Sequence, residues 1–205
     1  AQKGQIDDFN TYHENILEWI KIANEYKIPT FVLGVGLGGL IILNLLEKTE
    51  LPIEGILLFS PMLELKRDYK GCKNKLISNV GKISKDTRFK VGITPQDLTR
   101  NDEIIEETAN DGLMLKKVTY SWYNLINEKM KETMDHIRDI KPISALIMYG
   151  TNDKILETQS INEMKDKLKS KEMYFKVWDG LYHEIHNEPE RDLVMRYVLS
   201  FLNNS

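Results

Sequence analysis

A glycine-rich turn connects an apolar run at residues 31–34 to a helical pattern over residues 37–48, and it restricts the fold more than any other feature of the sequence. The pattern predicts a strand, a sharp turn and a helix. The spacing of Gly34, Gly36 and Gly38 matches the G-x-S-x-G elbow, in which a serine on a strained turn is the nucleophile. Gly36 has no side chain, so the pattern predicts a nucleophile position without a nucleophile.

The same turn also fits the dinucleotide-binding pattern G-x-G-x-x-G, with Gly34, Gly36 and Gly39 in the three glycine positions. That pattern requires an acidic residue roughly 20 positions further on, at the carboxyl end of the next strand, to bind the ribose. Glu54 precedes the next apolar run and Glu64 follows the proline beyond it, so neither is well placed. The turn alone leaves both interpretations open.

Two apolar runs in the last third of the sequence are each followed by a residue with catalytic chemistry. Asp153 follows the predicted strand at residues 145–149, and His183 follows the one at residues 174–178. Because active groups of α/β sheets gather at the carboxyl ends of the strands, we expect both side chains near the glycine turn. The order elbow, aspartate, histidine is that of an α/β-hydrolase, in which the carboxylate orients the imidazole. This order favours the hydrolase interpretation of the turn.

Several stretches along the chain carry a family resemblance, and the most specific is His-Glu-Ile-His-Asn-Glu-Pro-Glu-Arg, which begins at His183. With these stretches, the chain resembles the monoacylglycerol lipase and lysophospholipase branch of the serine α/β-hydrolases. The resemblance implies Asp153 as the catalytic acid, His183 as the base and the backbone amide of Leu37 as an oxyanion-hole donor. It also implies a small-molecule lipid ester as substrate. The stretches are residues 7–12, 29–34, 38–39, 55–61, 98–102, 150–153 and 183–191.

The elbow departs from this family, in which it usually reads Gly-His-Ser-Met-Gly-Gly. Val35 replaces the histidine and Gly36 replaces the nucleophile. We therefore expect an enzyme frame whose activity is absent or impaired. Three accounts stay open: a lipase with an altered nucleophile, a non-catalytic relative that binds lipid or a partner, and a cofactor-binding protein that uses the glycine turn.

The beginning of the chain departs from the family as well. Family members carry earlier strands and a His-Gly dipeptide whose loop supplies a second oxyanion-hole amide, whereas His13 is followed by Glu14 in a helical pattern. A sheet without those strands exposes a hydrophobic edge. We therefore expect these residues to represent part of a longer protein.

Strand and helix patterns alternate along most of the chain, which predicts an α/β fold with a mostly parallel sheet and helices on both faces. This alternation of strand and helix patterns stops over residues 62–141. An insertion of this length is too long for a plain loop, so we expect a helical cap. Residues 1–61 and 142–205 form the two parts of the core in this interpretation. The expected helices are 9–26, 37–48, 74–85, 102–115, 118–133, 158–170 and 188–203, and the expected strands are 30–33, 56–60, 145–149 and 174–178.

Composition restricts partners and compartment. A net charge of -3 argues against nucleic-acid binding, and the single Cys72 excludes an internal disulfide. We expect a cytoplasmic protein, since no apolar run has the roughly 18 residues of a spanning helix. Lys116 and Lys117 in the cap are compatible with peripheral membrane contact, although adjacent lysines are also typical of a solvated surface.

A metal site is not expected. His183, Glu184 and His186 lie close in sequence, but the zincin helix requires two histidines four residues apart, and these are three apart. The hydrolase interpretation requires no cofactor.

Overall fold

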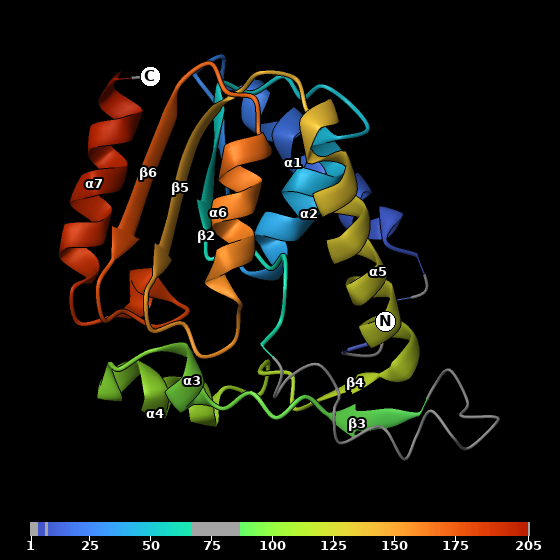
Figure 1. Cartoon of the computed structure of the whole chain (residues 1–205), viewed down its shortest axis with the longest axis vertical. Helices are drawn as coiled ribbons and strands as arrows, with labels where there is room; N and C mark the ends of the chain where they lie inside the picture. Colours follow the sequence, from blue (N-terminus) through green and yellow to red (C-terminus); the bar gives the residue numbers. More distant parts are fainter. Residues whose placement is uncertain (1–3, 7, 67–86, 205) are drawn as a thin grey trace.

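The structure is a computed structural model that describes residues 4–6, 8–66 and 87–204. Within these residues a four-stranded sheet forms the centre of the fold, and all three of its strand pairs are parallel. The expected α/β architecture is therefore confirmed (Figure 1). In spatial order the strands are β1 (Phe31–Val35), β2 (Gly55–Phe59), β5 (Ser144–Gly150) and β6 (Met173–Trp178).

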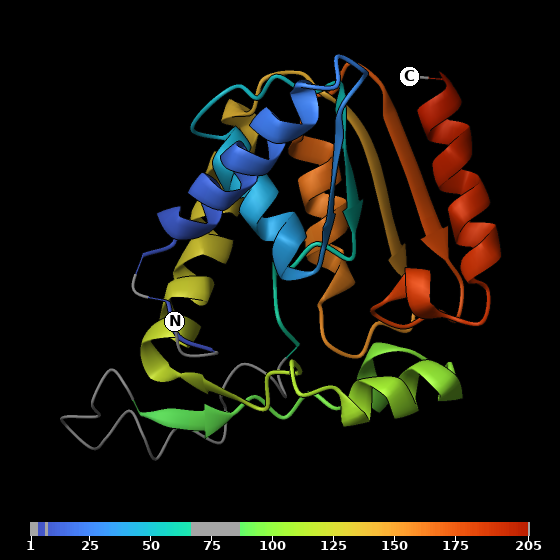
Figure 2. The ribbon, with the colours of Figure 1, turned by 180° about the vertical axis from the view of Figure 1, so that it is seen from behind.

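Helices cover both faces of this sheet (Figures 1 and 2). The central strand β2 is buried along its whole length, and its side chains alternate between two hydrophobic cores. Ile56 and Leu58 belong to the core under most of the helices, whereas Leu57 and Phe59 belong to the core under α7. The core helices are α1 (Asn10–Asn24), α2 (Leu37–Leu46) and α6 (Thr158–Lys167) on the first face and α7 (Arg191–Asn204) on the second.

A separate layer lies at the carboxyl ends of the strands (Figure 1). It contains α3 (Pro95–Leu98), α4 (Asp102–Asn110) and an antiparallel pair of strands, β3 (Arg88–Lys90) and β4 (Lys117–Thr119). The segment returns to the core through α5 (Tyr120–His136) and a short 3-10 helix (Ile137–Asp139).

The elements predicted for this inserted segment agree only in part with the structure. The segment contains the helices α3, α4 and α5, and also a pair of strands, β3 and β4, that the sequence analysis did not predict. Strands of three residues are too short to show an alternating pattern, so they could not be recognised in the sequence. The helix expected at 102–115 ends at Asn110, and the one expected at 118–133 begins at Tyr120, where the Thr119 side chain accepts a hydrogen bond from the amide of Trp122. The helix expected at 74–85 and Cys72 lie outside the described residues.

Helix α5 also contributes to the main core. Ile126 and Met130 are buried in the same cluster as the α2 side chains. Asn44 on α2 donates a hydrogen bond to the Thr133 hydroxyl on α5, at 3.1 Å. The inserted segment is thus anchored to the sheet domain through this helix.

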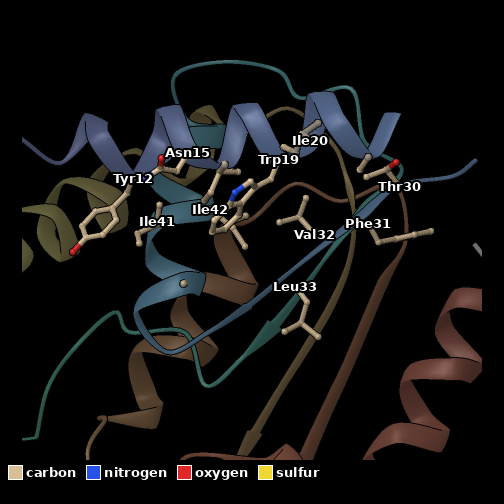
Figure 3. Close-up of a pocket in the computed structure, with 13 residues that line it drawn as sticks. Tyr12, Asn15, Trp19, Ile20, Thr30, Phe31, Val32, Leu33, Ile41 and Ile42 are labelled. Atoms are coloured by element: carbon tan, nitrogen blue, oxygen red, sulfur yellow. The ribbon is translucent and has the colours of Figure 1, made fainter. Parts of the chain in front are cut away.

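Strand β1 lies at one edge of the described sheet, and the surface beside it is apolar. Trp19 and Leu33 are 67% and 48% exposed. They line a groove of about 350 Å³ between α1, β1 and α2 (Figure 3). Among the described residues, β1 therefore combines a strand edge with exposed apolar side chains.

Candidate active site

The turn between β1 and α2 has the conformation of a nucleophile elbow. Gly36 has φ 51° and ψ -114°, a backbone conformation that residues with a side chain rarely adopt. Its amide donates a hydrogen bond to the Phe59 carbonyl at 3.0 Å. Two other glycines allow the helix to approach its neighbours. A Cβ at Gly34 would lie 2.6 Å from the Gly39 nitrogen, and one at Gly39 would lie 2.8 Å from the Pro61 Cβ. Gly34, Gly36 and Gly39 are therefore each required by the local backbone, whereas a Cβ at Gly38 would meet no atom within 4 Å.

The dinucleotide interpretation gains no support from the surroundings of this turn. Glu54 precedes β2, and its amide pairs with the Thr30 carbonyl just before β1, so it lies at the amino ends of the strands. The elbow lies at the carboxyl ends (Figure 1). This carboxylate is therefore at the wrong end of the sheet to bind a ribose held at the elbow.

Asp153 and His183 meet behind the elbow, as their positions after β5 and β6 predict. Asp153 is fully buried and His183 is 6% exposed. The His183 Nδ1 lies 2.8 Å from the Asp153 Oδ2. The other carboxylate oxygen accepts hydrogen bonds from the amides of Ile155 and Leu156, at 2.8 and 2.9 Å. Asp153 therefore caps the following turn and orients the imidazole at the same time.

The second ring nitrogen of His183 faces the elbow. A Cβ built on Gly36 would lie 3.0 Å from the His183 Nε2 and 3.6 Å from its Cε1. A side-chain oxygen attached to that carbon would therefore be within reach of the imidazole. The structure brings Gly36, Asp153 and His183 together in the arrangement of a nucleophile, an acid and a base.

The amide of Leu37 lies at the start of α2, next to the elbow. Neither this amide nor that of Gly38 has a hydrogen-bond partner within the described part of the chain. Both belong to the first turn of a ten-residue helix, whose free N–H groups and dipole favour negative charge. This is the position expected of an oxyanion-hole donor.

Sequence reasoning missed a serine that supports the histidine. Ser60 has φ 43° and is fully buried, and its hydroxyl donates to the His183 carbonyl at 2.8 Å. Two residues later, the Met62 amide donates to the Gly36 carbonyl at 2.9 Å. The segment after β2 thus contacts both the elbow and the histidine loop. Its Ser-Pro dipeptide was visible in the sequence, but its contacts depend on the fold.

An ion pair joins the inserted segment to the histidine loop. The Glu188 carboxylate is fully buried and accepts from the Tyr182 amide at 2.7 Å and from the Arg100 Nε at 2.9 Å. Nearby, the Glu184 amide donates to the Leu98 carbonyl at 2.8 Å. Both partners lie in stretches that carry the family resemblance, yet their pairing across 88 positions was not predictable from either stretch.

His186 is not positioned as a metal ligand. Its Nδ1 is buried and has no hydrogen-bond partner among the described residues. Its ring centre lies 6.1 Å from that of Phe59, and burial lowers its pKa. In the described ranges, no group of three or more histidine, cysteine, aspartate or glutamate side chains could hold a metal ion.

The parallel sheet, the elbow after β1 and the acid and base after β5 and β6 together define an α/β-hydrolase fold. The family profile Hydrolase_4, described as serine aminopeptidase, S33, matches residues 1–190. The chain therefore belongs to this family. Phospholipase YtpA of Bacillus subtilis is 28% identical over 200 residues, which cover 97% of this chain and 77% of that protein.

Solved structures of lipases have the same fold. The monoacylglycerol lipase of Paleococcus ferrophilus superposes with a TM-score of 0.79 and 22% identity, over 94% of this chain and 76% of that one. A soluble variant of the Saccharomyces cerevisiae monoglyceride lipase gives a TM-score of 0.82 and 19% identity, over 98% of this chain and 71% of that one. Within the described residues, no helix combines the length and the hydropathy needed to cross a membrane.

Proposed function

We propose that this chain carries the site of a carboxylic-ester hydrolase for monoacyl lipids, and that Gly36 makes the site inactive or strongly impaired. One observation carries the proposal. The His183 Nε2 lies 3.0 Å from the position of a Gly36 Cβ, while Asp153 holds the other ring nitrogen. A general base is thus aimed at the single point where the nucleophile of this fold belongs.

With serine at position 36, the chemistry would follow from this geometry. The His183 Nε2 would accept the hydroxyl proton, the serine oxygen would attack the ester carbonyl, and the Leu37 amide would donate to the resulting oxyanion. Asp153 would stabilise the imidazolium, whose Nε2 proton would pass to the alcohol oxygen as the ester bond breaks and the alcohol leaves. The neutral Nε2 would then take a proton from water as this water attacks the acyl-enzyme, and would return it to the serine oxygen as the fatty acid leaves. With Gly36 no acyl-enzyme forms, and serine proteases that lose a triad member keep only about 10³–10⁴-fold catalysis over water.

The substrate class is inferred from the relatives. Their names include a phospholipase and two monoacylglycerol lipases, which act on lipid esters. We assign residues 62–141 to a cap that selects the acyl chain and the head group. Peripheral membrane contact through this cap is supported by exposed apolar and basic side chains that lie next to one another. They are Leu113, Leu115, Lys116 and Lys117.

Labelling with a fluorophosphonate probe tests the proposal. The unmodified chain should remain unlabelled, and Gly36→Ser should become labelled at the introduced serine. Gly36→Ala is the matched control, because it adds the same Cβ and the same backbone strain without an oxygen. Labelling of the unmodified chain at another serine would contradict the assignment of Gly36 as the nucleophile position.

A further inference from the structure

We propose that the inserted segment positions the base of the candidate site. Residues 98–100 hold the loop of His183 so that its Nε2 faces Gly36, and Arg100 and Glu188 are the positioning residues. The inference rests on the proposed function, because it concerns the base of the same site. It goes beyond that function by making the direction of the imidazole depend on the inserted segment.

His183 lies in a loop, so its backbone is not fixed by a helix or a strand. β6 ends at Trp178, and the 3-10 helix Ile185–Asn187 begins two residues after His183. The Asp153 carboxylate holds the Nδ1 of the ring at 2.8 Å, but this hydrogen bond alone does not fix the backbone of the loop. The ring is directed at Gly36 only if the backbone on both sides of His183 is held.

Two hydrogen bonds hold the backbone at His183 and directly after it. The Ser60 hydroxyl donates to the His183 carbonyl at 2.8 Å, from the segment that follows β2. The Glu184 amide donates to the carbonyl of Leu98, the last residue of α3, at 2.8 Å. Figures 1 and 2 show α3 beside the chain that follows β6. The inserted segment thus holds the residue directly after the base.

The backbone directly before His183 is held through a buried ion pair. One Glu188 oxygen accepts from the Tyr182 amide at 2.7 Å. The other accepts from the Arg100 Nε at 2.9 Å and from the Arg100 backbone amide at 3.3 Å. Because Glu188 is fully buried, its charge requires such a partner. Without the Arg100 guanidinium, we expect this carboxylate to move toward water and to take the Tyr182 amide with it.

The inserted segment is itself fixed beside this loop. Thr99 is 1% exposed, and its hydroxyl donates to the Asn187 carbonyl at 2.9 Å. The Lys154 ammonium donates to the Gln96 carbonyl at 3.0 Å and lies 4.0 Å from the centre of the Tyr182 ring. Lys154 follows the acid of the candidate site directly in the sequence. The loops that carry the acid and the base therefore both contact α3 or the residues that follow it.

The geometry at the elbow leaves little tolerance for movement of the ring. The His183 Nε2 is 3.0 Å from the position of a Gly36 Cβ. A displacement of a reacting group by about 1 Å can lower a rate about 100-fold. Breaking the contact between Arg100 and Glu188 should therefore slow the reaction more than it weakens substrate binding.

Hydrolysis of p-nitrophenyl acetate in a Gly36→Ser background tests the inference. Arg100→Ala and Glu188→Gln should each lower kcat about 10- to 100-fold, because both break the contact that holds the loop before His183. KM should change less than about threefold, because the two residues act through the base and not on the substrate. The double variant should be about as slow as the slower single variant, since both substitutions break the same contact.

Leu168→Ala is the control for a general loss of stability. Leu168 is a buried core side chain directly after α6, at the amino ends of the strands and therefore away from the site (Figure 1). The cavity that this substitution creates should destabilise the fold but leave kcat within about twofold of the Gly36→Ser background. All rates are compared at a temperature where circular dichroism shows that every variant is folded. An equal loss of kcat in Leu168→Ala would overturn the inference.

The ¹⁵N chemical shifts of the His183 ring provide a second readout in the unmodified chain, where no hydrolysis is required. Arg100→Ala should move these signals and leave those of the exposed His136 ring in place. If the His183 signals move but Gly36→Ser shows no hydrolysis, only the proposed function fails. If Gly36→Ser is active and both Arg100→Ala and Glu188→Gln leave kcat unchanged, the positioning inference fails. It also fails if the His183 signals stay in place.

Discussion

Two clusters of buried polar side chains in this fold differ in how their atoms are paired. Behind the elbow, both carboxylate oxygens of Asp153 and the Nδ1 of His183 have hydrogen-bond partners. Between α1, α2 and α5, the Nε2 of His13 and the Oε2 of Glu47 are buried and have no partner among the residues that the structure describes. In the first cluster the carboxylate, the imidazole and Gly36 lie in one line. The second cluster has titratable groups that are also close together, but they do not point toward a common position.

The second cluster contains strong pKa shifts. Burial, followed by the charge of Lys48, lowers the pKa of His13 to about 4. Burial and the neighbouring Glu132 raise the pKa of Glu47 to about 7. Burial also acts to raise the pKa of Glu132, but hydrogen bonds from Lys129, Lys48 and Asn44 hold it at about 2. The shifted pKa values in this cluster therefore reflect burial and do not indicate a functional site. The candidate site is recognised instead by the alignment of Gly36, Asp153 and His183.

The largest effect should come from Asp153. In a Gly36→Ser background, Asp153→Asn should slow fluorophosphonate labelling by roughly 10³–10⁴-fold, because the amide no longer stabilises the imidazolium or fixes its tautomer. The asparagine oxygen can still accept from the Ile155 and Leu156 amides. The melting temperature should therefore change much less than the labelling rate. Equal labelling rates with and without Asp153→Asn would remove Asp153 from the site.

The buried ion pair beside the site should matter more for stability than the exposed one next to it. Glu188→Gln should lower the free energy of unfolding by about 3 kcal/mol, because Arg100 and the Tyr182 amide then share one neutral acceptor group. Glu190→Gln, which removes the more exposed partner of Arg100, should cost less than about 1 kcal/mol. Urea denaturation of both variants gives the comparison. Similar losses would show that burial of Glu188 adds nothing.

A smaller, pH-dependent effect is expected from Glu47. Its folded pKa of about 7 lies above the ordinary value of 4.5, so the folded state binds more protons between these values. The contribution of Glu47 to stability is therefore fully favourable at low pH and is lost as pH rises through about 7. Glu47→Gln should remove this loss, worth about 1–2 kcal/mol after allowing for solvent screening.

His13 provides the opposite control. Its folded pKa of about 4 lies below the ordinary 6.5, so its contribution to stability increases as pH rises from about 4 to 6.5. Between pH 4.5 and 6.5, His13 makes the free energy of unfolding rise with pH and Glu47 makes it fall. The free energy of unfolding of the parent protein should therefore change little with pH in this range. Glu47→Gln should reveal the rising slope and His13→Gln the falling one. Parallel pH curves for the two variants would contradict this account.

The sequence was sufficient to predict that Gly36, Asp153 and His183 lie close together, because each of these positions follows from a local pattern. The glycines of the elbow and the positions of Asp153 and His183 follow from where single strands end, and a strand's end is visible in a short window. The side-chain contacts that support the site and the inserted segment could not be predicted in this way. Arg100 reaches Glu188, and Asn44 reaches Thr133, across 88 and 89 positions, so both depend on how helices pack rather than on any local pattern. Strands β3 and β4 were missed because three residues are too few to show an alternating pattern.

Hydrolysis of a monoacylglycerol by the parent and by Gly36→Ser tests the central claim most directly. The account predicts turnover by Gly36→Ser at least about 100-fold above the parent, since only the serine allows an acyl-enzyme. Gly36→Ala should stay at the parent's rate, and His183→Gln should abolish the gain. Parent activity equal to that of Gly36→Ser, and unchanged in Gly36→Ala, would show that catalysis in this chain does not pass through position 36.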